Sequence, residues 1–286
     1  IGDVDSADIG RELWQLSRMI RSSDLIQSEF DEGVSEDLLD RCPQEFREAF
    51  QTFLYNHGAR GPNEWDIGAH TYETNPGLAL SMLNAMRQQD DSADPALAIE
   101  RNSRIREDHR AEFTAMFSEN EEASGMFAAG MQAGEVWLAA RERQKSTIVK
   151  PIQEIRLCFR EIGSRLALDG HIDDSELIFM LLERELDDFL ANPSSFNDRL
   201  IERERDYKEL FDLIPPFIVN TTCAPLSDWP RKSRQEITLV SLGEELEGVA
   251  CSPGIIQGTA RVILDPNDSM SLEPGDILVT QNTDPA

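Results

Sequence analysis

The sequence predicts a mainly α-helical protein that ends in a partial, β-rich α/β domain. Apolar residues recur at helical spacing from about residue 7 to residue 213, which is typical of packed helices. From about residue 236 the period changes to two, with β-branched runs and turn signals that are typical of strands. We therefore expect a multi-helix domain with its linker over residues 1–235, and the first part of a second domain over residues 236–286.

Capping signals mark the helices in order. Residues 40–43 precede one helix, "DDSADPALA" opens another with Pro95 near its first turn, and Gly170 follows the last apolar turn of a third. Two apolar stripes are Phe46, Phe50, Phe53 and Leu54, and Ile148, Ile152, Ile155, Phe159, Ile162 and Leu166. These signals predict roughly eight to ten helices, one of them over about residues 123–148 and another over about 148–166.

One long segment interrupts the helical pattern. Residues 57–77, "HGARGPNEWDIGAHTYETNPG", contain four glycines and two prolines, which end the preceding helix. Loops longer than about 12 residues inside a compact domain tend to be functional or disordered. Trp65 and Tyr72 favour an ordered loop.

After a stretch that contains "TTCAPLSDWPRKSRQ", strands are predicted. "GTARVIL" over residues 258–264 alternates as a strand does, and "EPGDILVT" over residues 273–280 places a Pro-Gly turn before another strand.

The composition excludes several classes of function. With 27 basic and 54 acidic residues, the net charge is −27, which disfavours binding to nucleic acid or to an anionic membrane surface. The sequence contains no run of about 18 apolar residues, the length that a membrane-spanning helix needs, so we expect a globular cytoplasmic protein.

Four cysteines lie far apart without a CxxC pair: Cys42, Cys158, Cys223 and Cys251. They predict neither a zinc site nor a disulfide framework. The start, "IGDVDSADIG", lacks the features of a signal peptide, and we expect a piece of a longer protein.

The last residues carry a specific pattern. It consists of Ser252-Pro253-Gly254, Gly258, Arg261-Val262, the strand entry at 274–279 and Thr283-Asp284-Pro285. This segment resembles the start of the phosphohistidine swivelling domain of phosphoenolpyruvate-utilising enzymes. The family's phosphate-carrying histidine follows in a Gly-Gly and Ser-His segment, and no histidine follows His171 here. The resemblance therefore implies a catalytic histidine beyond Ala286 and no catalytic residue in this chain.

Two helical segments are similar to the acceptor-binding domain of the rifampin phosphotransferase and phosphoenolpyruvate synthase-like group. They are "HGARGPNEWDI" and residues 141–186, which look like the family's helix pair followed by an acidic turn and a short helix. The family implies an ATP-grasp domain that phosphorylates the swivelling histidine, which then passes the phosphoryl group to a small hydroxylated acceptor in the helical domain. ATP and Mg would bind outside this chain, since it has no Gly-rich nucleotide loop. We expect the ATP-grasp domain upstream of Ile1 or on a separate subunit.

A pair of cations ends one helix face. Phe127, Met131, Gly134, Leu138, Arg141 and Lys145 follow at spacings of four, three, four, three and four. Either Arg141 and Lys145 extend to solvent at the edge of the core, or they hold a phosphoryl group or an anionic acceptor. The resemblance favours phosphoryl binding, because its Arg-x-x-x-Lys pair aligns with these two residues.

The glycine-rich loop supplies the other candidates. His57 ends its helix, and Gly58 suits a left-handed cap. Arg60, Glu64 and Asp66 are candidates for the polar edge of an acceptor pocket, where Glu64 or Asp66 orients or deprotonates a hydroxyl. Alternatively, Arg60 pairs with one of these carboxylates. Trp65 is the aromatic binding candidate, whereas Trp14 and Trp137 are expected in the core.

We predict no metal site. Glu64 and Asp66 lack a third ligand nearby, and His171, Asp173 and Asp174 are better explained by an Asp that caps the following helix. His109 is expected on a solvated helix face.

Two classes of function remain at this point. One is an ATP-dependent phosphohistidine phosphotransferase, of which the fragment alone is inactive. The other is a non-catalytic helical binding or regulatory module with a swivelling-domain vestige. A variant of the first is a subunit that receives phosphate from a separate protein.

Overall fold

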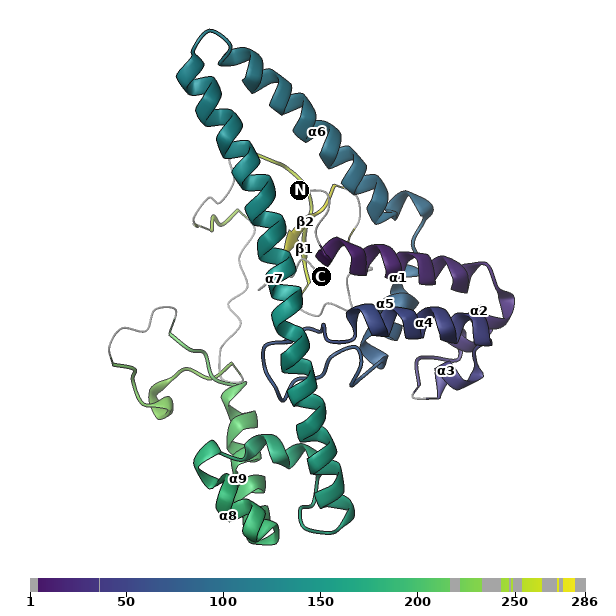
Figure 1. Cartoon of the computed structure of the whole chain (residues 1–286), viewed down its shortest axis with the longest axis vertical. Helices are drawn as coiled ribbons and strands as arrows, with labels where there is room; N and C mark the ends of the chain where they lie inside the picture. The colour runs from purple at the N-terminus through teal and green to yellow at the C-terminus, as the bar shows by residue number, and fades with distance from the viewer. Residues whose placement is uncertain are drawn as a thin grey trace. The chain divides into compact units, whose positions relative to one another are not determined.

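The computed structural model describes residues 5–35, 37–216, 222–232, 243–246, 248, 254–263, 272 and 275–280. Helices dominate these residues, with nine α-helices and two short strands (Figure 1). The α-helices are α1 Asp5–Arg21, α2 Asp24–Asp31, α3 Leu38–Arg41, α4 Gln44–His57, α5 Gly77–Met86, α6 Pro95–Met116, α7 Glu121–Leu168, α8 Leu186–Ala191 and α9 Asn197–Leu210. Short 3-10 helices are η1 Asp91–Ala93, η2 Ser175–Met180, η3 Glu183–Glu185, η4 Pro193–Phe196 and η5 Leu226–Asp228. The predicted helical class is confirmed.

The chain divides into two compact units. One contains residues 1–157, 262–272 and 279–286, and the other contains residues 158–261 and 273–278. The predicted domain boundary at 235/236 falls on residues outside the described ranges and stays a prediction.

The core of the first unit lies among α1, α2, α4 and α5. Helix α1 packs against the other three, which run beside it in Figure 1. The predicted stripe of Phe46, Phe50 and Phe53 is buried there, with each ring at most 1% exposed. Trp14 is also buried, as expected, at 6% exposure. Removing this much apolar surface from water is the main stabilising contribution to the unit.

The predicted capping signals are confirmed. Helix α4 begins after Pro43, and α6 begins at Pro95 with Asp94 as its cap, where the Asp94 carboxylate accepts a 2.8 Å hydrogen bond from the N–H of Ala96. Gly170 follows α7 with a φ of 74°, a backbone conformation that glycine adopts without steric cost. Asp174 caps η2 by accepting from the N–H of Glu176 at 2.8 Å.

Helix α7 differs from the prediction of two helices over residues 123–166. It is one helix of 48 residues that continues through Pro151. A proline inside a helix removes one hydrogen bond and crowds the preceding turn. Here the residues on both sides of Pro151 are held by burial, because Val149 and Gln153 are 1% and 2% exposed. Tertiary contacts therefore outweigh the local cost that predicted a break.

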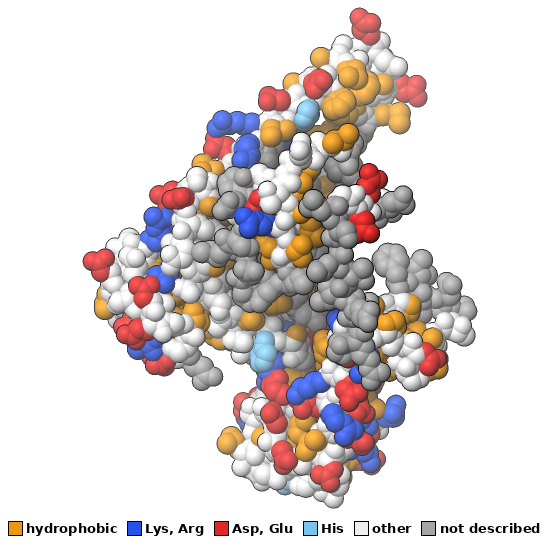
Figure 2. Space-filling model, turned by 180° about the vertical axis from the view of Figure 1, so that it is seen from behind, with side chains coloured by type: hydrophobic (Ala, Val, Ile, Leu, Met, Phe, Trp, Pro, Cys, Tyr) orange, Lys and Arg blue, Asp and Glu red, His pale blue; other side chains and the backbone are white. Residues whose placement is uncertain are grey.

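The hairpin of α6 and the first half of α7 is exposed along its length. Phe113 and Phe127 pack together at the hairpin's end with ring centroids 5.8 Å apart. The space-filling view shows apolar side chains gathered there (Figure 2). The prediction that Trp137 belongs to the core was wrong, since it is 72% exposed. Leu138 is also 41% exposed, and none of the side chains of α6 is buried.

The core of the second unit is smaller. Its buried members are Ile172, Leu177, Ile178, Phe189, Phe196 and Leu200. Helix α9 carries Arg203, whose guanidinium pairs with Glu185 of η3 at 2.6 Å.

His109, on α6 of the other unit, lies on a solvated helix face with a side chain 63% exposed, as predicted.

The two strands form a parallel pair. They are β1 Ala260–Val262 and β2 Ile277–Val279. The N–H of Ile277 donates to Thr259 O at 2.8 Å, and the N–H of Ile263 donates to Val279 O at 3.0 Å. Both predicted strands are confirmed, although each is shorter than expected. Ser252, Pro253 and the Thr283–Pro285 motif lie outside the described residues.

In the part of the chain that the structure describes, every helix is too short or too polar to cross a membrane.

Candidate functional site

The long segment between α4 and α5 carries most of the predicted site residues, and it is a loop, as predicted. Its two ends are paired with each other. The N–H of Tyr72 donates to Arg60 O at 2.8 Å, and the N–H of Glu73 donates to Gly58 O at 3.0 Å. Thr71 and Tyr72 are buried, at 0% and 7% exposure. The loop is therefore ordered, because its backbone is hydrogen-bonded and its side chains join the core.

Gly58 does not adopt the left-handed conformation that the sequence predicted. Its φ and ψ are −57° and −30°, which is right-handed helical backbone. A Cβ at this position would overlap the carbonyl oxygen of Leu54 and lie 3.0 Å from the Cβ of Glu73. Glycine is required here for close approach between the two ends of the loop rather than for a left-handed cap.

Glu64 is the centre of a buried charged cluster. Its side chain is 6% exposed, and Oε1 lies 3.2 Å from Arg60 Nε and 3.0 Å from Lys145 Nζ. Oε2 accepts a 3.1 Å hydrogen bond from the N–H of Gly61. A buried carboxylate needs such partners because an unpaired buried charge is strongly unfavourable. The structure thus brings together three of the predicted site residues, and the alternative interpretation that Arg60 pairs with a loop carboxylate is confirmed for Glu64.

The remaining loop candidates point to different surroundings. His57 lies against α1, with Nε2 3.2 Å from Glu12 Oε1 and its ring 5.3 Å from that of Phe53. Trp65 is 52% exposed. Asp66 Oδ1 accepts a 2.9 Å hydrogen bond from the N–H of Gly68. His57 therefore contacts α1, while Trp65 and Asp66 share the loop segment of Glu64.

The first half of the chain is similar to a known protein family. A family described as the rifampicin phosphotransferase fourth domain matches residues 1–142. Over these residues the chain is similar to that family. The predicted resemblance to the rifampin phosphotransferase group is thereby confirmed. The matched fourth-domain segment includes α1 to α6, the long loop and the first half of α7.

Homologues extend the match beyond the fourth-domain segment. A rifampicin phosphotransferase of a Streptomyces species is 26% identical over 303 residues, which covers 99% of this chain and 33% of that protein. An uncharacterized protein of Mycobacterium tuberculosis is 26% identical over 241 residues, covering 84% of this chain and 24% of its own length. An uncharacterized phosphotransferase of Bacillus subtilis is 29% identical over 138 residues, covering 46% of the chain and 16% of that protein. The chain thus spans a third or less of the length of these relatives.

The two predicted cations have different neighbours. Arg141 lies on α7, one residue before the end of the fourth-domain segment. Its side chain is 73% exposed and pairs with the adjacent Glu142 at 2.6 Å. Lys145, one turn later, is 35% exposed and contacts Glu64. The predicted helix face therefore continues as far as the buried cluster, but it brings only Lys145 into it. Arg141 stays at the surface, where an ion pair with an adjacent residue contributes little.

Two residues of α7 that the sequence did not single out also hold the loop. Arg156 is 0% exposed and Gln153 is 2% exposed. Gln153 Nε2 donates to Glu73 at 2.8 Å, and its Oε1 accepts from Arg156 at 2.5 Å. A usable signal was the continued spacing of four, four and three from Lys145 to Val149, Gln153 and Arg156. That signal was hidden because polar residues on a helix face are read as solvated.

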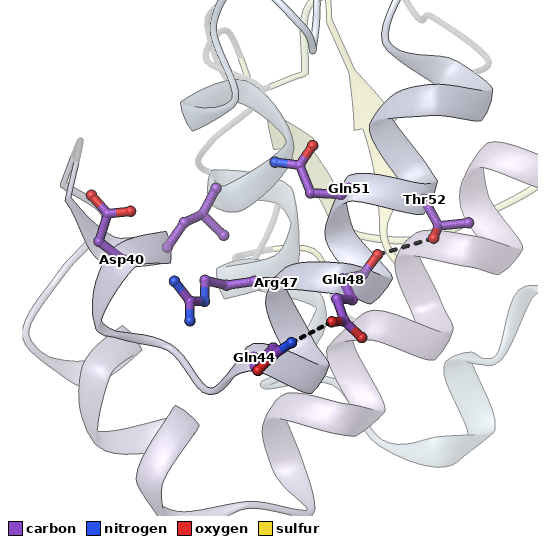
Figure 3. Close-up of a pocket in the computed structure, with 7 residues that line it drawn as sticks. Asp40, Gln44, Arg47, Glu48, Gln51 and Thr52 are labelled. Atoms are coloured by element: carbon purple, nitrogen blue, oxygen red, sulfur yellow. Dashed lines mark hydrogen bonds between the residues drawn. The ribbon is translucent and has the colours of Figure 1, made fainter.

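A separate hollow with a volume of about 760 Å³ lies on α3 and α4. Its lining is mostly polar and consists of Leu39, Asp40, Gln44, Arg47, Glu48, Gln51 and Thr52. Gln44 donates to the Glu48 carboxylate at 2.7 Å, and Thr52 donates to the Glu48 carbonyl at 3.0 Å (Figure 3). None of the predicted site residues lines this hollow.

Proposed function

We propose that this chain holds a small hydroxylated acceptor and receives a phosphoryl group on it, as part of a larger ATP-dependent phosphotransferase. The phosphoryl group would arrive on a histidine of the domain that begins near residue 236. Homology to rifampicin phosphotransferases supports the reaction class. ATP and its magnesium ion would bind in another part of the whole protein.

One observation carries the proposal, and it is the anchoring of Lys145 by Glu64. Lys145 Nζ lies 3.0 Å from Glu64 Oε1, and its side chain is still 35% exposed. An ammonium group has three N–H donors, so this contact leaves two for a ligand at the exposed side. Arg141 lies one turn away on the same face, which places the Cβ atoms of the two residues on the order of 6 Å apart, so that both long side chains can reach one ligand. That spacing suits the oxygens of one phosphoryl group.

In the proposed step, the acceptor's hydroxyl oxygen forms a new O–P bond as the N–P bond to the histidine breaks. The hydroxyl proton passes through solvent to the freed imidazole nitrogen, so atoms and charge balance. Lys145 and Arg141 offset the negative charge on the transferring group. Their contribution is electrostatic, and it requires that Lys145 is already in position before the donor arrives.

Glu64 would orient Lys145 rather than deprotonate the acceptor. Both of its carboxylate oxygens already accept from Arg60, Lys145 or Gly61. A general base must instead reach the acceptor's own hydroxyl. Asp66 and the half-exposed Trp65 remain our candidates for the edge of the acceptor pocket, with His57 at the end of α4.

The acceptor class follows from the surface and from the relatives. Exposed apolar side chains such as Trp65 and Trp137 suit a partly apolar molecule. The Streptomyces relative is named for rifampicin, an apolar molecule that carries hydroxyl groups. We therefore propose an acceptor of that chemical class, with rifampicin as the first compound to test.

The test uses the full-length gene product and intact-mass spectrometry before and after ATP. We expect a gain of one acid-labile phosphate, which is then lost when the acceptor is added. Lys145→Ala should keep the labile phosphate but slow its transfer to acceptor by about 100-fold, whereas Lys150→Ala, an exposed lysine on the same helix, should not. The isolated 286-residue chain should phosphorylate nothing. Absence of a labile phosphate on the full-length protein would overturn the proposal and favour a non-catalytic binding module.

A further inference from the structure

Arg156 is the most completely buried cation of the loop's surroundings. Among the described residues, its guanidinium hydrogen-bonds to Gln153 and to the long loop. Nε donates to Ile67 O at 3.2 Å, and Nη2 donates to Glu64 O and to Asp66 O at 2.8 Å each. Nη1 donates to Gln153 Oε1 at 2.5 Å. Three of the four acceptors are backbone carbonyls of one short segment, residues 64–67.

The segment that Arg156 holds is also the segment that carries the candidate side chains. Glu64, Trp65 and Asp66 all belong to it. The planar guanidinium presents five donors in a fixed arrangement, so it constrains the relative positions of three carbonyl groups, those of Glu64, Asp66 and Ile67. A lysine at the same place has a single ammonium centre and cannot reproduce that arrangement.

Arg156 and Lys145 lie on one stripe of α7. The buried residues Val149 and Gln153 stand between them, at 1% and 2% exposure. The helix therefore contacts the loop at two places: Arg156 binds the backbone of Glu64, and Lys145 binds its carboxylate. Because both contacts come from one continuous helix, the position of the Glu64 backbone set by Arg156 limits where its carboxylate can meet Lys145.

We propose that Arg156 is a positioning residue, which holds the loop carbonyls of residues 64–67 so that Glu64 anchors the phosphoryl-binding cation Lys145. The importance of this anchor rests on the proposed function, since only phosphoryl transfer gives Lys145 its task. A displacement of about 1 Å in a catalytic group is enough to slow a reaction by roughly 100-fold. Arg156 acts through Glu64 and Lys145 and does not touch the reacting atoms.

The test measures the Lys145–Glu64 contact directly by acylation of lysines in the intact 286-residue chain. The chain has four lysines, at positions 145, 150, 208 and 232, so each is followed separately by mass spectrometry. Acylation needs a free amine, and an ammonium held by a carboxylate reacts slowly. We expect Glu64→Gln to accelerate acylation of Lys145 roughly tenfold, and Arg156→Lys to do the same to within about twofold.

Two controls separate positioning from general loosening. Lys150 is exposed on the same helix, and its acylation rate should stay unchanged in every variant. Val149→Ala removes buried apolar contact beside the loop without removing a polar partner, and it should leave the rate of Lys145 unchanged. In the double variant Glu64→Gln with Arg156→Lys, the rate should equal that of Glu64→Gln alone, because both changes break the same contact.

Each alternative result contradicts the proposal. If Arg156→Lys leaves the rate of Lys145 at the wild-type value, or if its effect adds to that of Glu64→Gln, Arg156 does not act through Glu64. If Val149→Ala accelerates Lys145 equally, the role of Arg156 is packing. Should Arg156→Lys lose its helical circular dichroism, the neutral donor variant Arg156→Gln replaces it, and unfolding of both variants would show a general structural role. None of these readings uses ATP or acceptor, so a failure of the proposed phosphoryl transfer is detected separately.

Discussion

At the scale of single residues, the sequence indicated several structurally important positions but not always the physical reason for their importance. Gly58 was correctly singled out, yet the reason is the close approach of Leu54 and Glu73 and not a left-handed backbone. The pairing of Arg60 with Glu64, at 3.2 Å, was within reach because the two residues are four apart. Lys145 as the second partner of Glu64 was not, since no local pattern joins residues so distant in the chain.

We predict that Gly61→Ala destabilises the loop. A Cβ at Gly61 would lie 2.8 Å from His70 O and 3.0 Å from Thr71 Cα, and both are backbone atoms that cannot turn aside. The expected loss is about 1–3 kcal/mol of unfolding free energy, measured by urea denaturation. As the matched control, Gly134→Ala has no heavy atom within 4 Å inside α7, and it should stabilise by about 0.5–1 kcal/mol. An equal response of the two variants would contradict the structure of the loop.

At the scale of elements, α7 combines two different environments in one helix. Before Val149 none of its described side chains is buried, whereas Val149, Gln153 and Arg156 are at most 2% exposed. Local stability follows the number of buried contacts, so the second half is expected to be the stable one. The sequence did predict helix on both sides of Pro151, but only packing against the loop decides that the two halves are continuous.

Replacement of the proline inside α7 is predicted to stabilise the chain. Pro151 is exposed and has no N–H to donate, so Pro151→Ala restores a helical hydrogen bond and relieves crowding of the preceding turn. We expect a gain of about 1–3 kcal/mol in thermal or urea unfolding, compared with Lys150→Ala at the adjacent exposed position. A loss of stability would indicate that the backbone geometry imposed by Pro151 is needed for the loop contacts.

An ion pair between η3 and α9 predicts a pH dependence of the second unit. The Arg203 guanidinium, hydrogen-bonded to the Glu185 carboxylate, lowers the pKa of Glu185 from 4.5 to about 2. Because the folded-state pKa is the lower one, the pair's contribution is complete above pH 4.5 and is lost as pH falls toward 2.

The comparison is between the wild-type chain and Glu185→Gln, by thermal unfolding between pH 2 and pH 7. The wild type should melt at the higher temperature above pH 4.5, and the difference should shrink to nothing near pH 2. A difference in melting temperature that is independent of pH would mean that Glu185 contributes by packing and not by charge.

At the scale of the whole molecule, acidity is the dominant property. The net charge is −27, and like charges on a compact chain repel one another. The chain also spans at most a third of the length of the relatives compared above. We therefore expect the stability of the chain itself to depend on its net charge, while the proposed phosphoryl transfer belongs to the whole protein.

We predict that the chain becomes more stable as ionic strength rises from about 0.01 M to 0.15 M, because the Debye length falls from about 30 Å to 8 Å and screens the net repulsion. The measurement is the thermal midpoint in sodium chloride at pH 7.5, with matched concentrations of neutral sucrose as the control for osmolarity. A falling midpoint would show that attractive ion pairs such as Arg203–Glu185 outweigh the net charge.

The sequence by itself determined the helical class, the capping residues of α4 and α6, the loop between α4 and α5, and the similarity of the first 142 residues to a known family. Each of these follows from neighbours a few residues apart, or from a motif that is continuous in the chain. Only the tertiary structure decided that α7 runs unbroken through Pro151, that Trp137 is exposed, and that Glu64 joins Lys145 while Arg156 holds the loop backbone. These depend on burial and charge pairing between residues far apart in the chain, and a local pattern carries no information about which distant side chain will satisfy a buried charge.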